Sequence, residues 1–308
     1  MHPTTMQDPL VGKRLREYAI LELVGKGGTA KVYKARHVLL DELRAIKILR
    51  PELCETKELN DRFRREAKIL LRLRERHLVT VYEFGILGRD NLFMVMEFLE
   101  GESLRARLSQ TLWLHPSEAI EIAKQVALGL SRVHDKGVVH RDVSPDNIVL
   151  VPTEDGEDVK LIDFGIAKNV LAPLESKITG TLTFVGKAAY CSPEQIKLDG
   201  RGDDVDGRSD IYSLGVTLYE LLTGSLPFRG DNPQAYVTQH LSAPPMSMYE
   251  ANPLVRVPRA LEKLVARMMD KHRDERPQSM REVLIELSAL ADEKCGATTL
   301  AVQAPFAV

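Results

Sequence analysis

The chain has 308 residues, of which 44% are hydrophobic and 28% charged, as in globular proteins with one large core or two joined lobes. Its formal net charge of −2 gives no overall basic field for nucleic acid or an anionic membrane. The three cysteines lack metal-ligand spacing, no apolar run approaches ~18 residues, and the N-terminus does not resemble a signal peptide. We therefore expect a cytoplasmic protein with no nucleic-acid partner and no membrane segment.

The predicted elements of the first third are mainly strands. Residues 1–10 read as a loose leader, and three short β-rich runs follow within residues 18–50. A charged amphipathic helix is predicted at about residues 60–74. Two further strands are predicted at residues 78–87 and 91–99, separated by a turn.

The rest of the chain is predominantly helical. Segments with helical character follow Gly101, and they are residues 117–137, 209–224, 259–271 and 279–292. Strands with one helix, followed by helices, are typical of an α+β fold with two segregated halves. The boundary between the halves is predicted near residues 97–101.

The first chemical signal is a glycine-rich segment at residues 25–32, with the sequence GKGGTAKV. Glycines let backbone N–H groups come close to phosphates, although a plain turn is the better interpretation of this segment alone. In a dinucleotide-binding fold the glycines open a helix, and an acidic residue follows about 20 positions later. Here the glycines lead into residues 32–36, which read as a strand, so the dinucleotide-binding interpretation fails.

The second signal is Lys47 in a predicted strand, with Ala45 on the same face because strand side chains alternate. A small residue at 45 leaves room for a flat ring, and Lys47 can reach phosphate oxygens. The following helix supplies Glu66 as an ion-pair partner for Lys47. Considered alone, Lys47 is best interpreted as a solvated strand residue and Glu66 as one of several solvated charged residues.

The third signal is a pair of polar loops that each border an apolar strand. One loop has the sequence HRDVSPDN and contains Asp142 and Asn147, and the other, DFG, begins with Asp163. Asn147 and Asp163 supply the oxygen ligands that Mg²⁺ prefers, and Asp142 can orient and deprotonate a hydroxyl group. Each residue alone reads as a loop or cap residue, but all these signals in this order are very unlikely by chance.

These segments together resemble the protein kinase family, particularly the eukaryotic-like serine/threonine kinases of bacteria, over about residues 18–290. The resemblance implies ATP-dependent phosphorylation of serine and threonine on other proteins, with Mg²⁺ as the metal and Mn²⁺ as an alternative. It implies a small β-rich N-lobe with one helix over a larger helical C-lobe. We assign residues 1–10 to a flexible leader, 11–290 to the kinase domain and 291–308 to a tail.

The resemblance also assigns roles by position. Asp142 corresponds to the catalytic base, and Asn147 and Asp163 correspond to the metal ligands. Lys47, paired with Glu66, corresponds to the lysine that binds the α- and β-phosphates. The other nucleotide-binding positions, which cover the phosphates or enclose adenine, are Val24, Gly25, Lys26, Gly27, Gly28, Val32, Ala45, Met96, Glu97, Leu99 and Val149.

The hinge and the segment at residues 192–194 follow from the same resemblance. The N-lobe is expected at about residues 11–96, the hinge at 97–101 and the C-lobe at 102–290, with Met96 as the gatekeeper and backbone groups of Glu97 and Leu99 facing adenine. Residues 192–194, with the sequence SPE, are similar to the family's Ala-Pro-Glu. Their expected partner is Arg276, and Asp210 is expected to brace the catalytic loop.

The sequence departs from the family pattern at three positions. Ala30 replaces a glycine, which is a mild change. Ser144 stands where serine/threonine kinases have a lysine that contacts the γ-phosphate, and Lys187 stands where they have a threonine. We interpret the last two as a swap, since charge near the γ-phosphate is needed in the transition state and Lys187 can supply it. Unrelated drift is the alternative interpretation.

Two classes of function remain open on the sequence alone. An active kinase is favoured because Lys47, Glu66, Asp142, Asn147 and Asp163 are all present, whereas a pseudokinase scaffold usually lacks one of these groups. Thr179 and Thr181 are the expected phosphorylation sites of the activation loop, modified by the kinase itself. Protein substrates are the expected partners, and the resemblance leaves a homodimer open. The chain is either a complete small kinase or the catalytic piece of a longer receptor.

Overall fold

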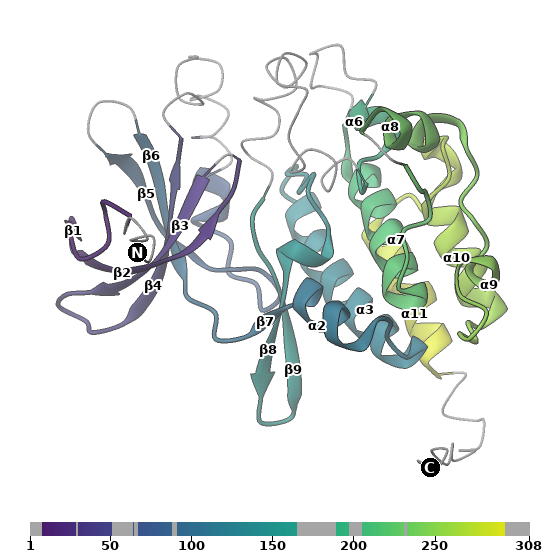
Figure 1. Ribbon diagram of the computed structural model, residues 1–308, viewed down its shortest axis with the longest axis horizontal. Coiled ribbons are helices and arrows are strands. Elements are labelled where there is room, and N and C mark those ends of the chain that lie inside the picture. The colour runs from purple at the N-terminus through teal and green to yellow at the C-terminus, as the bar shows by residue number, and fades with distance from the viewer. Residues whose placement is uncertain are drawn as a thin grey trace, which may run out of the picture.

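A strand-rich half and a helical half lie side by side in the computed structural model (Figure 1). The structure describes residues 8–28, 30–50, 64, 67–87, 91–164, 189–196, 205–230 and 233–292. The strands β1 to β6 make up the strand-rich half, and the helices of the second half gather on the opposite side of the molecule. This arrangement confirms the predicted α+β fold with a small N-lobe and a larger helical C-lobe.

The N-lobe contains a six-stranded sheet in the order β1-β2-β3-β4-β6-β5. Each strand is antiparallel to its neighbours. Tyr33, Ile46, Phe93 and Val95 are completely buried and form the centre of the core on this sheet. The strands are β1 (Arg14–Leu15), β2 (Tyr18–Lys26), β3 (Ala30–His37), β4 (Leu43–Leu49), β5 (Val81–Leu87) and β6 (Asn91–Glu97).

The predicted helix at residues 60–74 is described only in part. Arg64 and residues 67–70 are helical, and the chain turns at residues 71 and 72. Ala67 is completely buried and Leu70 is 4% exposed, so this helix packs its apolar face on the core as predicted. Residues 60–63, 65 and 66 lie outside the described part.

Residues 8–10, which were predicted to belong to the leader, pack on the sheet. Oδ1 of Asp8 accepts hydrogen bonds from the Leu10 N–H at 3.1 Å and from the Tyr33 hydroxyl at 3.0 Å. Its Oδ2 pairs with Lys31 at 2.8 Å, and Leu10 contacts the core of the sheet. These residues therefore belong to the packed chain rather than to a flexible leader.

A second sheet joins the two lobes. It contains β7 (Glu102–Ser103), β8 (Ile148–Thr153) and β9 (Gly156–Leu161), in that order. The end of β9 also forms a parallel bridge between Leu161 and Leu78, which lies just before β5. Because β8 follows the catalytic loop and β9 precedes Asp163, this small sheet holds both predicted chemical segments in place.

The C-lobe is built around a single buried helix. Every residue of α7 from Ser209 to Thr223 is buried, which indicates a helix covered by protein on all sides. It begins after the Asp206 cap and ends at Gly224, whose φ of 72° suits glycine. Besides α7 (Gly207–Thr223), the helices are α2 (Leu104–Thr111), α3 (Pro116–His134), η2 (Pro145–Asn147), α6 (Pro193–Ile196), α8 (Pro233–Ser242), α9 (Met248–Ala251), α10 (Arg259–Met268), η4 (Arg273–Glu275) and α11 (Met280–Asp292).

The predicted helices at 117–137, 209–224, 259–271 and 279–292 correspond to α3, α7, α10 and α11. The helices α2, α8 and α9 were not predicted. Within the described part of the chain, none of the helices has both the length and the apolar character needed to cross a membrane.

Candidate functional site

The catalytic loop, residues 140–147, is held from below by the buried carboxylate of Asp210 on α7. This carboxylate accepts hydrogen bonds from the N–H groups of His140 at 2.8 Å and Arg141 at 2.7 Å, and it lies 2.8 Å from Nε2 of His134. Burial acts to raise the pKa of Asp210, but the hydrogen bond and charge of His134 hold it below its usual value. Arg141 has a φ of 65°, a backbone conformation that residues other than glycine rarely adopt. The hydrogen bond from its N–H to Asp210 helps to stabilise this conformation.

Asp142 lies in this braced loop, and Asn147 closes the loop on itself. The side-chain Nδ2 of Asn147 donates to the carbonyl of Asp142 at 2.7 Å. The Asn147 carbonyl in turn accepts from the N–H of Ile162 at 2.9 Å, one residue before Asp163. The segments that carry Asp142 and Asp163 are therefore joined through Asn147, by one side-chain hydrogen bond and one backbone hydrogen bond.

Lys47 of β4 forms an ion pair with Asp163, although the two residues are 116 positions apart. The lysine side chain is 13% exposed and the aspartate 37% exposed. Asp163 has a φ of 60°, which turns its carboxylate out of the line of the preceding strand. Within the described part of the chain, Lys47 thus contacts the predicted metal ligand Asp163. Glu66, the partner predicted for Lys47, lies outside the described residues.

The glycine-rich segment joins two antiparallel strands. Gly25 pairs with Val32 and Lys26 pairs with Lys31, and the Gly27 N–H donates to the Ala30 carbonyl at 2.9 Å. This hairpin agrees with the strand predicted after the glycines and excludes the strand-to-helix turn of dinucleotide-binding folds. Arg50, after β4, also donates to the Gly27 carbonyl at 3.1 Å and helps to position the turn.

The residues predicted to enclose adenine come from both lobes. Ala45 of β4 pairs in register with Met96 of β6, which is 9% exposed. Val149 of β8 is also 9% exposed, whereas Val24 of β2 is 48% exposed. Val32 and Leu99 are partly buried, and Gly28 is exposed at the glycine-rich turn.

The hinge is fixed by Glu97. Its N–H donates to the Thr80 carbonyl at 2.9 Å, and its carboxylate accepts from the Thr80 N–H at 3.2 Å. Lys160 pairs with the same carboxylate at 3.1 Å. Since the N–H of Glu97 is already used, any contact of this residue with adenine would have to come from its carbonyl.

The segment that resembles Ala-Pro-Glu is anchored to the C-lobe. Glu194 and Arg276 form a doubly hydrogen-bonded ion pair at 2.7 Å and 2.9 Å, as the resemblance predicted. Gln195, which the sequence analysis missed, donates through Nε2 to the Arg141 carbonyl at 3.1 Å. Its Oε1 accepts from Ser192, so Gln195 links this segment to the catalytic loop.

Arg105 of α2 was also missed by the sequence analysis, and no motif in the sequence marks it. Its guanidinium contacts Asp146 of the catalytic loop, the hydroxyl of Tyr190, and Glu220 of α7. The three partners lie 41, 85 and 115 positions away in the chain. Only the packed structure brings them together.

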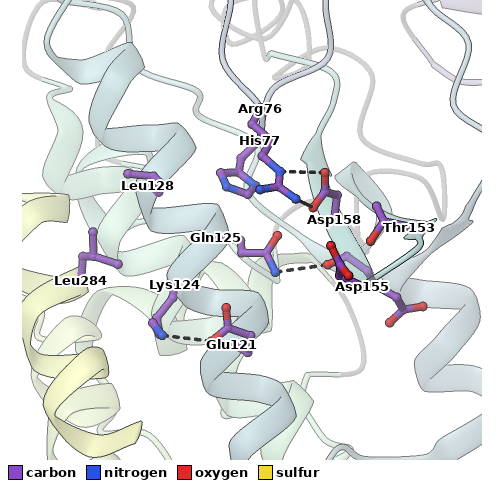
Figure 2. A pocket seen from close by; sticks show the side chains of 11 residues that line it. Arg76, His77, Glu121, Lys124, Gln125, Leu128, Thr153, Asp155, Asp158 and Leu284 are labelled. Carbon is purple, nitrogen blue, oxygen red and sulfur yellow. Dashed lines mark hydrogen bonds and ion pairs between the residues drawn. The ribbon is translucent and has the colours of Figure 1, made fainter. Parts of the chain in front are cut away.

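A separate pocket of about 310 Å³ lies between α3, the β8–β9 hairpin and α11. Figure 2 shows Arg76 against Asp158 on the hairpin and Gln125 of α3 directed at the same hairpin. Arg76 donates to both oxygens of Asp158, at 2.7 Å and 2.9 Å, and Oε1 of Gln125 accepts from the Val159 N–H at 2.9 Å. These contacts brace the hairpin that carries the catalytic loop and Asp163 at its ends.

Several predicted site residues lie outside the described part of the chain. They are Glu66, Lys187, Thr179 and Thr181. Ser144, the proposed swap partner of Lys187, is 6% exposed, and its carbonyl accepts from the N–H of Asn147 at 3.0 Å.

Comparisons with known proteins agree with this geometry. The protein kinase domain matches residues 18–286. The chain is 37% identical over 290 residues to the serine/threonine-protein kinase pkn3 of Myxococcus xanthus, covering 93% of this chain and 52% of that protein. It is 37% identical over 275 residues to PrkC of Bacillus subtilis, covering 88% of this chain and 40% of that protein. The chain thus spans about half or less of the length of these relatives.

The fold is similar to solved kinase structures. The kinase domain of Mycobacterium tuberculosis PknI superposes with a TM-score of 0.71 at 24% identity, covering 91% of this chain and 98% of that domain. Rad53 in complex with AMP-PNP superposes with a TM-score of 0.69 at 25% identity, covering 87% of this chain and 64% of that one. Because the kinase domain match spans most of the chain, and named bacterial serine/threonine-protein kinases are its relatives, the chain belongs to the protein kinase family.

Proposed function

We propose that this chain transfers the γ-phosphoryl group of ATP to serine and threonine hydroxyls of proteins. The observation that carries the proposal is the convergence of Lys47 and Asp163 beside the braced loop of Asp142 and Asn147. These groups come from distant parts of the sequence and from both lobes. Phosphoryl transfer needs little besides positioning and charge stabilisation, and this set of groups can supply both.

Asp142 is the proposed catalytic base. A base must lie within hydrogen-bond reach of the attacking hydroxyl, so its loop has to be held rigidly. The carboxylate of Asp210 and the amide of Asn147 provide that support. Asp142 thereby orients the acceptor hydroxyl and takes its proton.

Lys47 and the glycine-rich hairpin are the proposed phosphate-binding elements. Lys47 is held among buried residues of β4 with its ammonium group at Asp163, where it can contact phosphate oxygens. The hairpin supplies backbone N–H groups without bulky side chains. The proposed nucleotide site comprises Val24, Gly25, Lys26, Gly27, Gly28, Val32, Ala45, Lys47, Met96, Glu97, Leu99 and Val149.

Asn147 and Asp163 are the proposed metal ligands, and their donor atoms fit a hard divalent cation. The Nδ2 of Asn147 is used by the Asp142 carbonyl, which leaves the amide oxygen as the donor atom for a metal. Protein kinases use ATP with a divalent metal, and we propose Mg²⁺ here, with Mn²⁺ as an alternative. When bound, such an ion neutralises charge on the phosphates.

Autophosphorylation of the activation loop is part of the proposal, with Thr179 and Thr181 as the sites. Protein substrates are the proposed partners, and the proposal neither requires nor excludes a homodimer. The second candidate function is a nucleotide-binding scaffold with little turnover. The presence of Lys47, Asp142, Asn147 and Asp163 favours the enzyme over the scaffold.

Incubation of the full chain with γ-³²P-ATP and Mg²⁺, followed by phosphosite mapping by mass spectrometry, tests this function. We expect phosphoserine or phosphothreonine on the chain and on an added protein such as casein, and none with the Asp142→Asn variant. Nucleotide binding without any transfer would favour the scaffold. Phosphotyrosine alone would contradict the serine/threonine assignment.

A further inference from the structure

The glycine-rich hairpin, residues 25–32, is fastened to the segment before β1 by an ion pair. Lys31 of β3 donates to Oδ2 of Asp8 at 2.8 Å. Oδ1 of the same carboxylate accepts from the hydroxyl of Tyr33 at 3.0 Å and from the N–H of Leu10 at 3.1 Å. The Asp8 side chain is 9% exposed and the Lys31 side chain is 35% exposed. One largely buried carboxylate therefore joins two residues of β3 to the segment before β1.

Asp8 belongs to a segment that is hydrogen-bonded to β2. The Gly12 N–H donates to the Ile20 carbonyl at 3.0 Å, and the Ile20 N–H donates in return to the Lys13 carbonyl at 2.9 Å. The hydrogen bond from Lys31 holds the pKa of Asp8 below its ordinary value, so the carboxylate stays ionised at neutral pH. Asp8 is therefore a fixed negative charge on a segment that the sheet holds in place.

The ion pair lies on the face of the sheet opposite the proposed nucleotide. Side chains alternate along a strand, so Lys31 and Tyr33 lie on one face of β3 and Val32, a proposed nucleotide-binding residue, lies on the other. Tyr33 is completely buried in the core on its own face. The contact with Asp8 can therefore act on a bound nucleotide through the position of the hairpin rather than by touching the phosphates.

The turn of the hairpin is exposed and rich in glycine. Lys26, Gly27 and Gly28 are exposed, and a Cβ added at Gly28 would meet no atom within 4 Å in the described part of the chain. Lys26 pairs in register with Lys31, and like charges directly opposite each other destabilise a strand pair. Glycine also loses more conformational freedom on ordering than any other residue, so fixing this turn costs free energy. The ion pair with Asp8 offsets the repulsion and fixes β3 next to the turn.

We propose that Asp8 and Lys31 are positioning residues that hold the glycine-rich hairpin in the conformation that binds phosphates. This inference rests on the proposed nucleotide site. With the ion pair in place the hairpin is preorganised, so little binding free energy is lost to ordering it. Without the ion pair only a fraction of the molecules has the binding-competent hairpin, and the apparent affinity for a nucleotide with phosphates falls by that fraction.

The affinities for adenosine and for a non-hydrolysable ATP analogue with Mg²⁺ separate this role from a general loss of structure. Both molecules carry the same base and ribose, but only the analogue has phosphates for the hairpin to bind. The quantity measured is the Kd of adenosine divided by the Kd of the analogue, from isothermal titration of the full chain. At ~0.15 M salt the Debye length is ~8 Å, so the charge change at Asp8 is largely screened from the phosphates. A purely structural role would weaken both affinities equally and leave this ratio as it is.

We expect Asp8→Asn to weaken binding of the analogue about fivefold and binding of adenosine less than about twofold, so the ratio falls. Lys31→Gln removes the same ion pair but also the repulsion with Lys26, so its ratio falls by a smaller factor. The double variant Asp8→Asn/Lys31→Gln resembles Lys31→Gln, because the ion pair is already absent. The control is Glu17→Gln, which breaks an exposed pair with Arg14 in the same lobe and keeps the parent ratio.

The proposal is overturned if Asp8→Asn keeps or raises the parent ratio, which includes an equal loss of affinity for both molecules. If Asp8→Asn does not fold, the more exposed Lys31→Gln decides, and an unchanged ratio rejects the idea. A parent chain that binds neither molecule, or binds both equally, refutes the proposed phosphate-binding site and this inference with it. A parent chain that binds the analogue more tightly than adenosine, with variants of unchanged ratio, refutes this inference alone.

Discussion

Arg276 and Glu194 form an ion pair in which the arginine side chain has no exposed surface and the glutamate is 14% exposed. The guanidinium donates at 2.7 Å and 2.9 Å to the two carboxylate oxygens, and also to the backbone carbonyls of Asp270 and Arg208. The pair joins residues 82 positions apart and connects residues 192–194 to the helical part of the C-lobe.

Arg276→Met is expected to lower the free energy of unfolding by about 3–5 kcal/mol, because it leaves the Glu194 carboxylate buried without its cation. The double variant Glu194→Gln/Arg276→Met is expected to lose less, since no charge remains unpaired. Urea denaturation measures both values. The control is Arg14→Met, which breaks an exposed pair with Glu17 and should cost less than about 1 kcal/mol. An Arg276→Met loss as small as the control would contradict the role of the pair.

His240 of α8 makes the stability of the C-lobe depend on pH. Its Nδ1 lies 2.8 Å from the hydroxyl of Tyr212 on α7, and its side chain is completely buried beside Phe228. Burial, with the charge of Lys271, lowers the pKa of His240 to about 3. Burial also lowers the pKa of Lys271 to about 8, so this lysine stays protonated in acid.

The folded chain therefore keeps His240 neutral down to about pH 3, whereas the unfolded chain protonates it near its ordinary pKa of 6.5. Between these values the unfolded state binds one more proton, so the contribution is present above pH 6.5 and is lost as the pH falls. His240→Gln should reduce the slope of unfolding free energy against pH by about 1.4 kcal/mol per pH unit between pH 6 and 4.5. Denaturation at several pH values measures it, and a variant with the parent slope would show that His240 is not the group responsible.

Lys47→Met and Asp142→Asn are expected to abolish turnover for different reasons. Each should lower kcat by at least ~100-fold. Lys47→Met should also weaken ATP binding, because it removes a phosphate contact, and Asp163→Ala should do the same through the metal. Asp142→Asn should leave ATP affinity largely intact, since the proposed role of Asp142 is to contact the acceptor hydroxyl rather than ATP. Isothermal titration with a non-hydrolysable ATP analogue separates the two effects, and near-normal turnover of Asp142→Asn would mean that the base is assigned incorrectly.

Phosphorylation of the activation loop is expected to raise activity. A phosphate brings up to two negative charges that can pair with Arg141 beside the catalytic base. The double variant Thr179→Ala/Thr181→Ala should therefore have lower activity after preincubation with ATP. Thr179→Ser/Thr181→Ser is the matched control, because it keeps both hydroxyls. Undiminished activity of the alanine variant would show that phosphorylation of Thr179 and Thr181 does not regulate the enzyme.

Lys187 is expected to replace the lysine that is missing at Ser144. Lys187→Met should lower kcat by roughly 100-fold with a smaller effect on ATP affinity, because the charge matters most in the transition state. Ser144→Lys/Lys187→Thr restores the usual family pair and should recover much of the loss. Ser144→Lys alone would bring two ammonium groups together and should not improve the enzyme. A Lys187→Met protein as active as the parent would show that Lys187 does not replace the lysine missing at position 144.

The sequence by itself determined the fold class and the succession of the main strands and long helices along the chain. It also determined the motifs around Lys47, Asp142, Asn147 and Asp163. Periodicity and contiguous motifs are local properties, and local properties are what a single sequence records. The helices α2, α8 and α9 were missed because short helices carry a weak local signal and depend on tertiary packing.

The tertiary structure alone decided which distant residues contact one another. The structure brings Lys47 to Asp163, 116 positions away, a pair that the sequence motifs do not predict. It alone brings Arg105 to Glu220, and Gln195 to the carbonyl of Arg141. Such contacts depend on tertiary packing, because packing places side chains together regardless of their separation in the chain.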